Sequence, residues 1–295
     1  MKKRKIVRDV EDSLLTFTKI KNQIDIKYYN MFIEKFKIEG LEYQERNYIL
    51  KQLYNVGTIG AIRVENSESE YNPSGDLIFV PYAPTLFNIY DYPVSATPIN
   101  KRGLPFIPNN PLIVGEEIVI GFIQPDRRGI KEIVNYYSTR IAEVEQTIRT
   151  NLFTHKMPFL IAVTPENKQR METLINRVLE GENKVLVDVS DVGSIKVLNA
   201  NNNYIIDKLK QYSQQLENEL RERLGFDNLG TMEKKEHLIT SEVEVNNDVI
   251  NNSNDIYLSN LESFFADIND LFGYKISVEL KSDERDVIIE DEKLK

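Results

Sequence analysis

The sequence predicts an α+β fold built around two long helices. Two segments, 129–152 and 204–224, each carry one apolar stripe with a spacing of three or four residues, the period of an amphipathic helix. A short strand–helix–strand pattern lies between them, and a proline-rich region with strand character precedes them. The chain has 295 residues, of which 41% are hydrophobic, enough to bury a sizeable core.

Two helices are expected before Gly57. Asp12 and Ser13 are suitable helix caps, and the apolar residues that follow recur at helical spacing up to Gly40: Leu14, Phe17, Ile20, Ile24, Tyr28, Met31 and Phe32. A second, shorter helix is predicted over Gln44–Tyr54, and Gly57 ends it.

From Thr58 to Phe122 the sequence has strand character. Three runs rich in β-branched and aromatic residues predict strands at Ile59–Val64, Leu77–Pro81 and Glu117–Ile123. Nearly all of the prolines lie between Pro73 and Pro125, a distribution typical of turns and irregular loops.

The two long helices carry the architecture. The first stripe is Ile130, Val134, Tyr137, Ile141, Val144, Ile148 and Leu152. The second is Ile205, Leu209, Tyr212, Leu216 and Leu220, and Gly225 ends that helix. Helices this long with one apolar stripe each cannot make a thick core alone. We therefore expect neighbouring copies to pack side by side, as in helical bundles.

Between these helices, strands are predicted at Phe159–Val163, Val185–Val189 and Ile195–Leu198, with a helix from Thr164 to Gly181. After Gly225 the chain is polar, and the stretch Asn246–Asp255, with its five asparagines, is expected to be irregular. A last amphipathic helix, Leu258–Phe272, should bury Leu261, Phe264, Phe265, Ile268 and Leu271, followed by a strand at Tyr274–Leu280.

The composition excludes several classes of protein. The chain has no cysteine, so disulfides, thiolate zinc sites and cysteine nucleophiles are absent. Its formal net charge is −9, which argues against a monomer that coats nucleic acid but allows a protein that surrounds DNA without gripping it. No apolar run approaches the length of a membrane-spanning helix, and no apolar segment follows the basic N-terminus. We expect a soluble intracellular protein.

A search for catalytic motifs finds little. There is no P-loop or Gly-x-Ser-x-Gly elbow, and His155 and His237 lie in no metal-ligand spacing. Glu166, Glu182 and Lys184 loosely resemble the acid–acid–lysine set of metal-dependent nucleases, in which carboxylates hold a cation that activates water. The simpler interpretation is favoured, in which Glu166 supports a helix N-terminus and the other two lie in a solvated turn. We predict no catalytic residue, metal or cofactor.

Two basic clusters have alternative interpretations. The N-terminal residues Lys2, Lys3, Arg4, Lys5 and Arg8 could bind nucleic acid or an acidic partner, but a disordered, solubilising tail is the favoured interpretation. Lys234 and Lys235, flanked by Glu233 and Glu236, would ordinarily form a solvated charge run.

A collinear set of segments changes that interpretation. One segment is polar and comprises Asn228, Leu229, Met232–Glu236, Thr240–Val243, Asn246–Asp248, Asn252 and Ser253. The others are Val56–Gly60, Pro158–Ile161, Tyr204–Leu209 and Ile268–Gly273. Together they resemble upper collar proteins, the portal or head–tail connector of small picovirus-type short-tailed phages. The likeness extends from about Tyr48 to Leu280.

The resemblance implies a portal fold whose parts follow one another along the chain. They would be an N-terminal arm and wing (1–128), a first stem helix (129–157), an α/β clip (158–202), a second stem helix (203–226), a channel loop (227–255), and a C-terminal wing helix, crown strand and tail (256–295).

The resemblance also implies a dodecameric ring at one capsid vertex of the virion, assembled in the host cytoplasm. Double-stranded DNA would pass through the ring during packaging and ejection. The implied partners are the major capsid protein, the packaging ATPase and the lower collar or tail proteins, with no membrane partner. Some relatives bind a packaging RNA through a basic N-terminal arm, a role that Lys2, Lys3, Arg4, Lys5 and Arg8 would suit.

The resemblance assigns nucleic-acid-facing positions as well. Lys208 would form a ring of positive charge on the stem, and Lys234 and Lys235 would lie on channel loops that retain packaged DNA. Related proteins place a further lysine before the second stem helix, where this chain has Asn199, so a second stem ring is in doubt. The alternatives are another collar or tail adaptor without a stem, and the metal-dependent nuclease.

Overall fold

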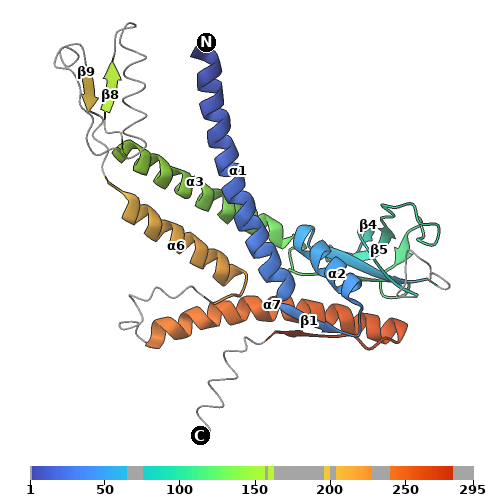
Figure 1. The fold of residues 1–295 in the computed structure, drawn as a ribbon. Helices are drawn as coiled ribbons and strands as arrows, with labels where there is room; N and C mark the ends of the chain where they lie inside the picture. Colours follow the sequence, from blue (N-terminus) through green and yellow to red (C-terminus); the bar gives the residue numbers. More distant parts are fainter. Residues whose placement is uncertain are drawn as a thin grey trace. The chain divides into compact units, whose positions relative to one another are not determined.

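The computed structural model describes residues 2–64, 76–156, 159–162, 196–199, 204–227 and 240–281. The chain divides into two compact units. Figure 1 labels the main helices and several of the strands along the chain. The small unit contains Met1–Ile20 and Arg140–Leu216, and the large unit contains Lys21–Thr139 and Glu217–Lys295. Helices and small antiparallel sheets share the chain, which confirms the α+β fold class.

The N-terminal helix α1 is longer at its start than predicted and shorter at its end. It spans Lys2–Glu34, so the expectation of a disordered tail over residues 2–8 is wrong. Lysine and arginine are good helix formers, and neither glycine nor proline interrupts this segment. The helix does not continue to Gly40, because β1 (Phe36–Glu39) pairs antiparallel with β10 (Ser277–Leu280).

Helix α2 spans Tyr43–Asn55 and confirms the second predicted helix. Its start is fixed by a capping box, in which the backbone N–H of Glu42 donates to the Glu45 carboxylate at 3.0 Å. Ile49, Leu50 and Leu53 are fully buried on its inner face. Gly57, with a φ of +91°, turns the chain into the next strand.

The strand region forms two three-stranded antiparallel sheets. In one, β2 (Thr58–Arg63) lies between β3 (Leu77–Val80) and β7 (Ile118–Phe122), which confirms all three predicted strands. The other contains β4 (Tyr82–Phe87), β5 (Pro93–Pro98) and β6 (Leu112–Ile113). The interpretation of this proline-rich stretch as turns and loops is therefore wrong in part. Pro84 lies on β4, an outer strand, where a missing backbone donor is tolerated.

Helix α7 spans Thr240–Phe272 and packs against β7 and β10. Leu261, Phe264, Phe265 and Ile268 are buried as predicted, whereas Leu271 is half-buried. The helix begins well before Leu258, so the prediction of an irregular stretch through Asp255 is wrong. Ile250 and Tyr257 are buried and extend the apolar stripe backwards at helical spacing, so tertiary packing outweighs the weak helix propensity of asparagine.

Helices α3 (Ile130–Lys156) and α6 (Ile206–Arg223) confirm the two long helices. On α3 the predicted stripe is buried from Ile130 through Ile148, but Leu152 is exposed. The buried residue in the first turn of α6 is Ile206. Of the predicted stripe, Ile205 just before the helix and Tyr212 on it are each 37% exposed. Tyr212 is turned outward, where its hydroxyl accepts a hydrogen bond from the Arg140 guanidinium of α3 at 2.5 Å.

The predicted α/β module is described in part. Strand β8 (Phe159–Ala162) pairs antiparallel with β9 (Lys196–Asn199), which confirms the first and third predicted strands. The predicted helix from Thr164 to Gly181 and the strand at Val185–Val189 lie outside the described residues.

Candidate nucleic-acid interface

Lys208 is the predicted DNA-facing residue that the structure describes fully. It lies in the first turn of α6, and its side chain is exposed. The basic residues Lys2, Lys3, Arg4, Lys5 and Arg8 lie in the first turns of α1. Lys234 and Lys235 lie outside the described residues. Asn199 ends β9.

The exposed face of α6 has little net charge. Asp207, Lys208 and Lys210 lie near its start, and Gln211, Gln214 and Gln215 follow along the exposed face. Lys210 is an exposed cation two residues from Lys208, which the sequence analysis did not single out. Amide side chains hydrogen-bond to phosphates or water without releasing counterions, and counterion release supplies most non-specific affinity for DNA. A duplex beside this face would therefore meet few cations.

The exposed face of α3 is also mostly polar, and several of its hydroxyls are occupied. Thr139, Thr147 and Thr150 each donate to the backbone carbonyl four residues earlier, at 2.7 to 3.0 Å. Hydroxyls used in this way are not free donors for a phosphate.

A second surface, in the large unit, is apolar. The turn between β4 and β5 exposes Ile89 and Tyr90, which are 89% and 82% accessible. Leu86 and Phe87 beside them are also exposed. We call these four residues the hairpin patch. The stretch Tyr82–Val114 contains only three charged residues, Asp91, Lys101 and Arg102, although 28% of the whole chain is charged.

The turn that presents the hairpin patch is held in one conformation. The Asn88 side-chain oxygen accepts hydrogen bonds from the backbone N–H groups of Tyr90 and Tyr92, at 2.9 and 3.0 Å. Asp91 has a φ of +58°, and its carbonyl accepts a hydrogen bond from Arg127, whose guanidinium also lies over the Tyr92 ring. Ile89 and Tyr90 are therefore exposed on an ordered turn.

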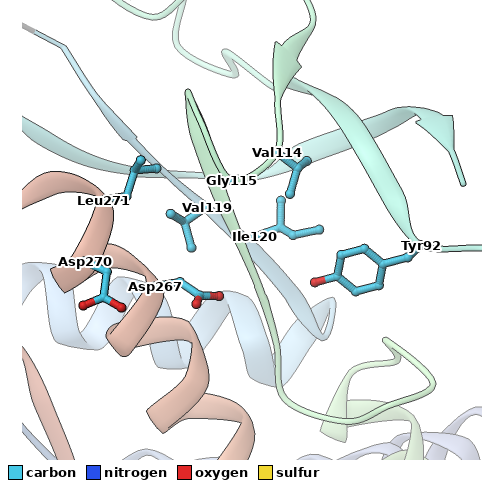
Figure 2. Close-up of a pocket in the computed structure, with 8 residues that line it drawn as sticks. All are labelled: Tyr92, Val114, Gly115, Val119, Ile120, Asp267, Asp270 and Leu271. Carbon is cyan, nitrogen blue, oxygen red and sulfur yellow. The ribbon is translucent and has the colours of Figure 1, made fainter.

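A cavity of about 490 Å³ lies between β7 and α7 in the large unit (Figure 2). Asp267 and Asp270 reach it from α7, and the Tyr92 hydroxyl points across it toward Asp267. Burial and the neighbouring Asp270 raise the pKa of Asp267, and burial followed by the Asp267 charge raises the pKa of Tyr92. Two carboxylates alone make no metal site. Within the described ranges, no group of three or more His, Cys, Asp or Glu residues could hold a metal ion.

The residues considered for other chemistry do not form a described site. Glu166, Glu182, Lys184 and His237 lie outside the described residues. His155 is exposed, and its ring lies 5.6 Å from that of Tyr204. Among the helices in the part of the chain that the structure describes, none is both long and apolar enough to cross a membrane.

Comparison with known proteins gives a family match and several similar structures. The family model Phage Connector (GP10) matches residues 114–285, more than half of the chain. In the portal and tail of native bacteriophage P68, a chain 14% identical has a TM-score of 0.49, with 94% of this chain and 90% of that chain covered. For an HK97 family phage portal protein from Corynebacterium diphtheriae, identity is 10%, the TM-score 0.45 and coverage 88% and 92%. A chain in the virion of a native gene transfer agent particle has 9% identity, a TM-score of 0.44 and coverage of 92% and 84%.

Proposed function

Because this chain belongs to the phage connector family, we infer that it is a portal subunit, one copy in a ring at the head–tail junction of a phage virion. Double-stranded DNA passes through such a ring during packaging and ejection. The observation that carries this conclusion is the family match across residues 114–285, which includes β7, α3, α6, α7 and β10. The resemblance identified from the sequence is thereby confirmed.

The connector family is a structural class, and we propose that this chain catalyses no reaction. The chemical work of packaging would then belong to a separate motor ATPase. The nuclease alternative, which rests on Glu166, Glu182 and Lys184, predicts magnesium-dependent cleavage of plasmid DNA. Intact plasmid after incubation of purified rings with magnesium would support the structural role, and reproducible cleavage would contradict it.

We propose that neighbouring copies contact one another through the hairpin patch. A ring is built from head-to-tail contacts, so each copy must supply two unlike surfaces. Chains with a net charge of −9 repel one another, which favours a contact surface that is poor in charge, and the hairpin patch lies in such a stretch. An ordered turn also loses little conformational entropy when it docks.

The DNA-facing role of Lys208, Lys234 and Lys235 remains our proposal. What supports it for Lys208 is an exposed position on a helix face rich in glutamine. In a ring, one lysine per copy becomes a circle of cations, which attracts phosphates from every side, whereas the acidic chain as a whole repels them. Such a surface allows DNA to slide.

The remaining assignments follow from the family resemblance and are proposals too. We propose a dodecamer whose clip, residues 158–202, faces the packaging ATPase and later the lower collar or tail. The ring would also contact the major capsid protein and would assemble in the host cytoplasm. The basic start of α1 (Lys2, Lys3, Arg4, Lys5 and Arg8) would bind nucleic acid, such as a packaging RNA, or an acidic partner.

Mass photometry combined with negative-stain imaging of the purified chain tests this function directly. We expect particles close to twelve chain masses, with an axial hole and a projecting stem. Rings without a stem would favour the collar or tail adaptor instead. A chain that stays monomeric across a wide range of protein and salt concentrations would contradict the portal assignment.

A further inference from the structure

Lys35, at the junction of α1 and β1, is a buried cation. The residue is 8% exposed. No carboxylate forms an ion pair with its ammonium among the residues that the structure describes. Burying an unpaired charge is unfavourable, and this burial lowers the pKa of Lys35 to about 7. A methionine or leucine would fill the same space without the cost of burying a charge. The role of Lys35 therefore lies in the contacts of its ammonium.

The ammonium of Lys35 binds the carboxyl end of α6. Its Nζ donates hydrogen bonds to the carbonyl oxygens of Leu224 and Gly225, at 2.5 and 3.2 Å. Three aromatic rings surround it, with ring centres 4.8 to 6.0 Å from Nζ: those of Phe226, Tyr257 and Phe36. The negative end of the helix dipole and the faces of aromatic rings both favour a cation.

At the end of α6, the other hydrogen bonds of the helix terminus use carbonyls that precede those of Leu224 and Gly225. The N–H of Phe226 bonds to the Arg221 carbonyl at 2.8 Å, and the N–H of Gly225 bonds to the Glu222 carbonyl at 3.0 Å. This is the Schellman pattern, with Gly225 in the left-handed region at a φ of +69°. The Tyr257 hydroxyl donates a hydrogen bond to the Arg223 carbonyl at 2.8 Å. The carbonyls of Leu224 and Gly225 come next, and they are the ones that Lys35 binds.

The backbone of Lys35 is itself held on two sides. Its N–H donates to the Phe32 carbonyl at 3.3 Å, and its own carbonyl accepts from the N–H of Lys281 at 2.9 Å. The first contact joins it to the end of α1, and the second to the residue after β10. Gly225, which supplies one of the bound carbonyls, is closely packed, because a Cβ there would lie 2.6 Å from Nζ and would collide with Asn254.

From this geometry we propose that Lys35 is a positioning residue that fixes the carboxyl end of α6, the point from which the chain continues toward Lys234 and Lys235. One side chain thereby links the α1–β1 junction, the end of α6 and, through the shared Tyr257, α7. We call the contact of Lys35 with the end of α6 the anchor. Its effect on DNA retention rests on the proposed function of Lys234 and Lys235, but the existence of the anchor does not.

Hydrogen exchange on assembled rings tests the anchor. In Lys35→Met, which keeps an apolar side chain of similar length but no donor, amides in the peptide 221–227 should exchange about tenfold faster or more, because two buried carbonyls lose their donor. Amides of α2 and β2 should be unchanged. Lys37→Met is the matched control, since Lys37 is an exposed lysine on β1 that pairs with Glu279 at 2.6 Å. It should leave the exchange of 221–227 as in the parent.

Two results would overturn the proposal. One is parental exchange of 221–227 in Lys35→Met, and the other is an equal rise in every element, which would make Lys35 a general stabiliser. If Lys35→Met does not fold, Lys35→Gln replaces it in the test. This variant retains an N–H donor on a shorter side chain, so the exchange of 221–227 should rise by less than in Lys35→Met. Parental exchange of 221–227 in Lys35→Gln would also overturn the proposal. Genome retention by Lys234→Ala/Lys235→Ala rings is measured separately, so failure of the DNA role and failure of the anchor are distinguishable.

Discussion

Replacement of Lys35 by methionine should change how the stability of the protein depends on pH. The pKa of Lys35 falls from an ordinary value of 10.5 to about 7 because the side chain is buried. Below pH 7 both the folded and the unfolded chain hold the proton, so the cost of burying the cation is constant. Between pH 7 and 10.5 the unfolded chain holds the proton and the folded chain largely does not. The free energy of unfolding therefore rises with pH across this window.

The size of this effect follows from the shift. Each pH unit within the window contributes at most about 1.4 kcal/mol. Between pH 7 and 9.5 the parent should therefore gain up to about 3 kcal/mol relative to Lys35→Met. Two carbonyls, three rings and the helix end favour the cation and oppose part of the shift, so we expect about 1–3 kcal/mol.

Urea unfolding followed by far-ultraviolet circular dichroism measures this difference. Ionisation of the chain's tyrosines would disturb a fluorescence signal at the upper end of the range, so circular dichroism is preferable. Other titrating groups act equally in parent and variant and cancel when the two curves are subtracted. Lys37→Met should follow the parent throughout, since Lys37 is exposed. Parallel curves for the parent and Lys35→Met from pH 7 to 9.5 would refute the reasoning.

Four further predictions concern assembly, DNA and packing. Tyr90→Ser combined with Ile89→Ser should lower the fraction of chains in rings at least tenfold in mass photometry. The control Tyr43→Ser, at a tyrosine 67% exposed on α2, should not lower it. Equal ring formation by both variants would show that the hairpin patch is not part of the interface. Lys234→Ala with Lys235→Ala should leave rings intact but reduce the DNA retained in filled heads, and parental genome content in virions would contradict this role. Lys208→Gln should lower the salt dependence of short-duplex binding to rings, whereas Asp207→Asn should not, and identical salt slopes for Lys208→Gln and the parent would count against the stem ring. Gly121→Val should destabilise the large unit by about 1–3 kcal/mol or more, because a Cβ at Gly121 would lie 2.5 Å from the Phe264 ring; an unchanged urea midpoint would show that α7 can move away from β7.

The long helices could be predicted from the sequence because a single apolar stripe determines both their period and their length. The stripe of α3 is buried from Ile130 to Ile148 as its spacing predicts. The start of α7 was predicted incorrectly because asparagine favours turns, and the evidence against a turn was only two apolar residues, Ile250 and Tyr257, with polar residues between them. Tertiary packing determines that the start of α7 is helical, and local propensity does not indicate this.

The second sheet could not be predicted from the sequence for a different reason. Prolines at 84, 93 and 98 are typical of loops, yet they lie in strands β4 and β5. Proline removes one donor from a strand, which matters only where a neighbour needs that donor. Pro84 lies on the outer strand β4, whereas Pro93 and Pro98 are the first and last residues of the central strand β5, and both kinds of position are set by the whole fold. The same holds for Lys35, whose burial depends on residues at the end of α6, 189 and 190 positions away in the chain, and on Tyr257 of α7, which is farther still.

The candidate site could be predicted only in part, because chemistry at a ring axis is set by symmetry more than by local motifs. A lysine such as Lys208 has no unusual neighbours, and nothing in its own surroundings distinguishes it from any solvated lysine. In the ring that we propose, repetition would alter its effect, since each copy would add a cation at the same height along the axis while the net charge of −9 per chain would repel the duplex elsewhere. DNA that must move in both directions requires attraction to cations at a few heights along the axis, with each attraction too weak to stop the duplex. The position of those few cations along the axis then matters more than their number. In our proposal Lys35 contacts no DNA, but by binding the carbonyls at the end of α6 it fixes the point from which the chain continues toward Lys234 and Lys235.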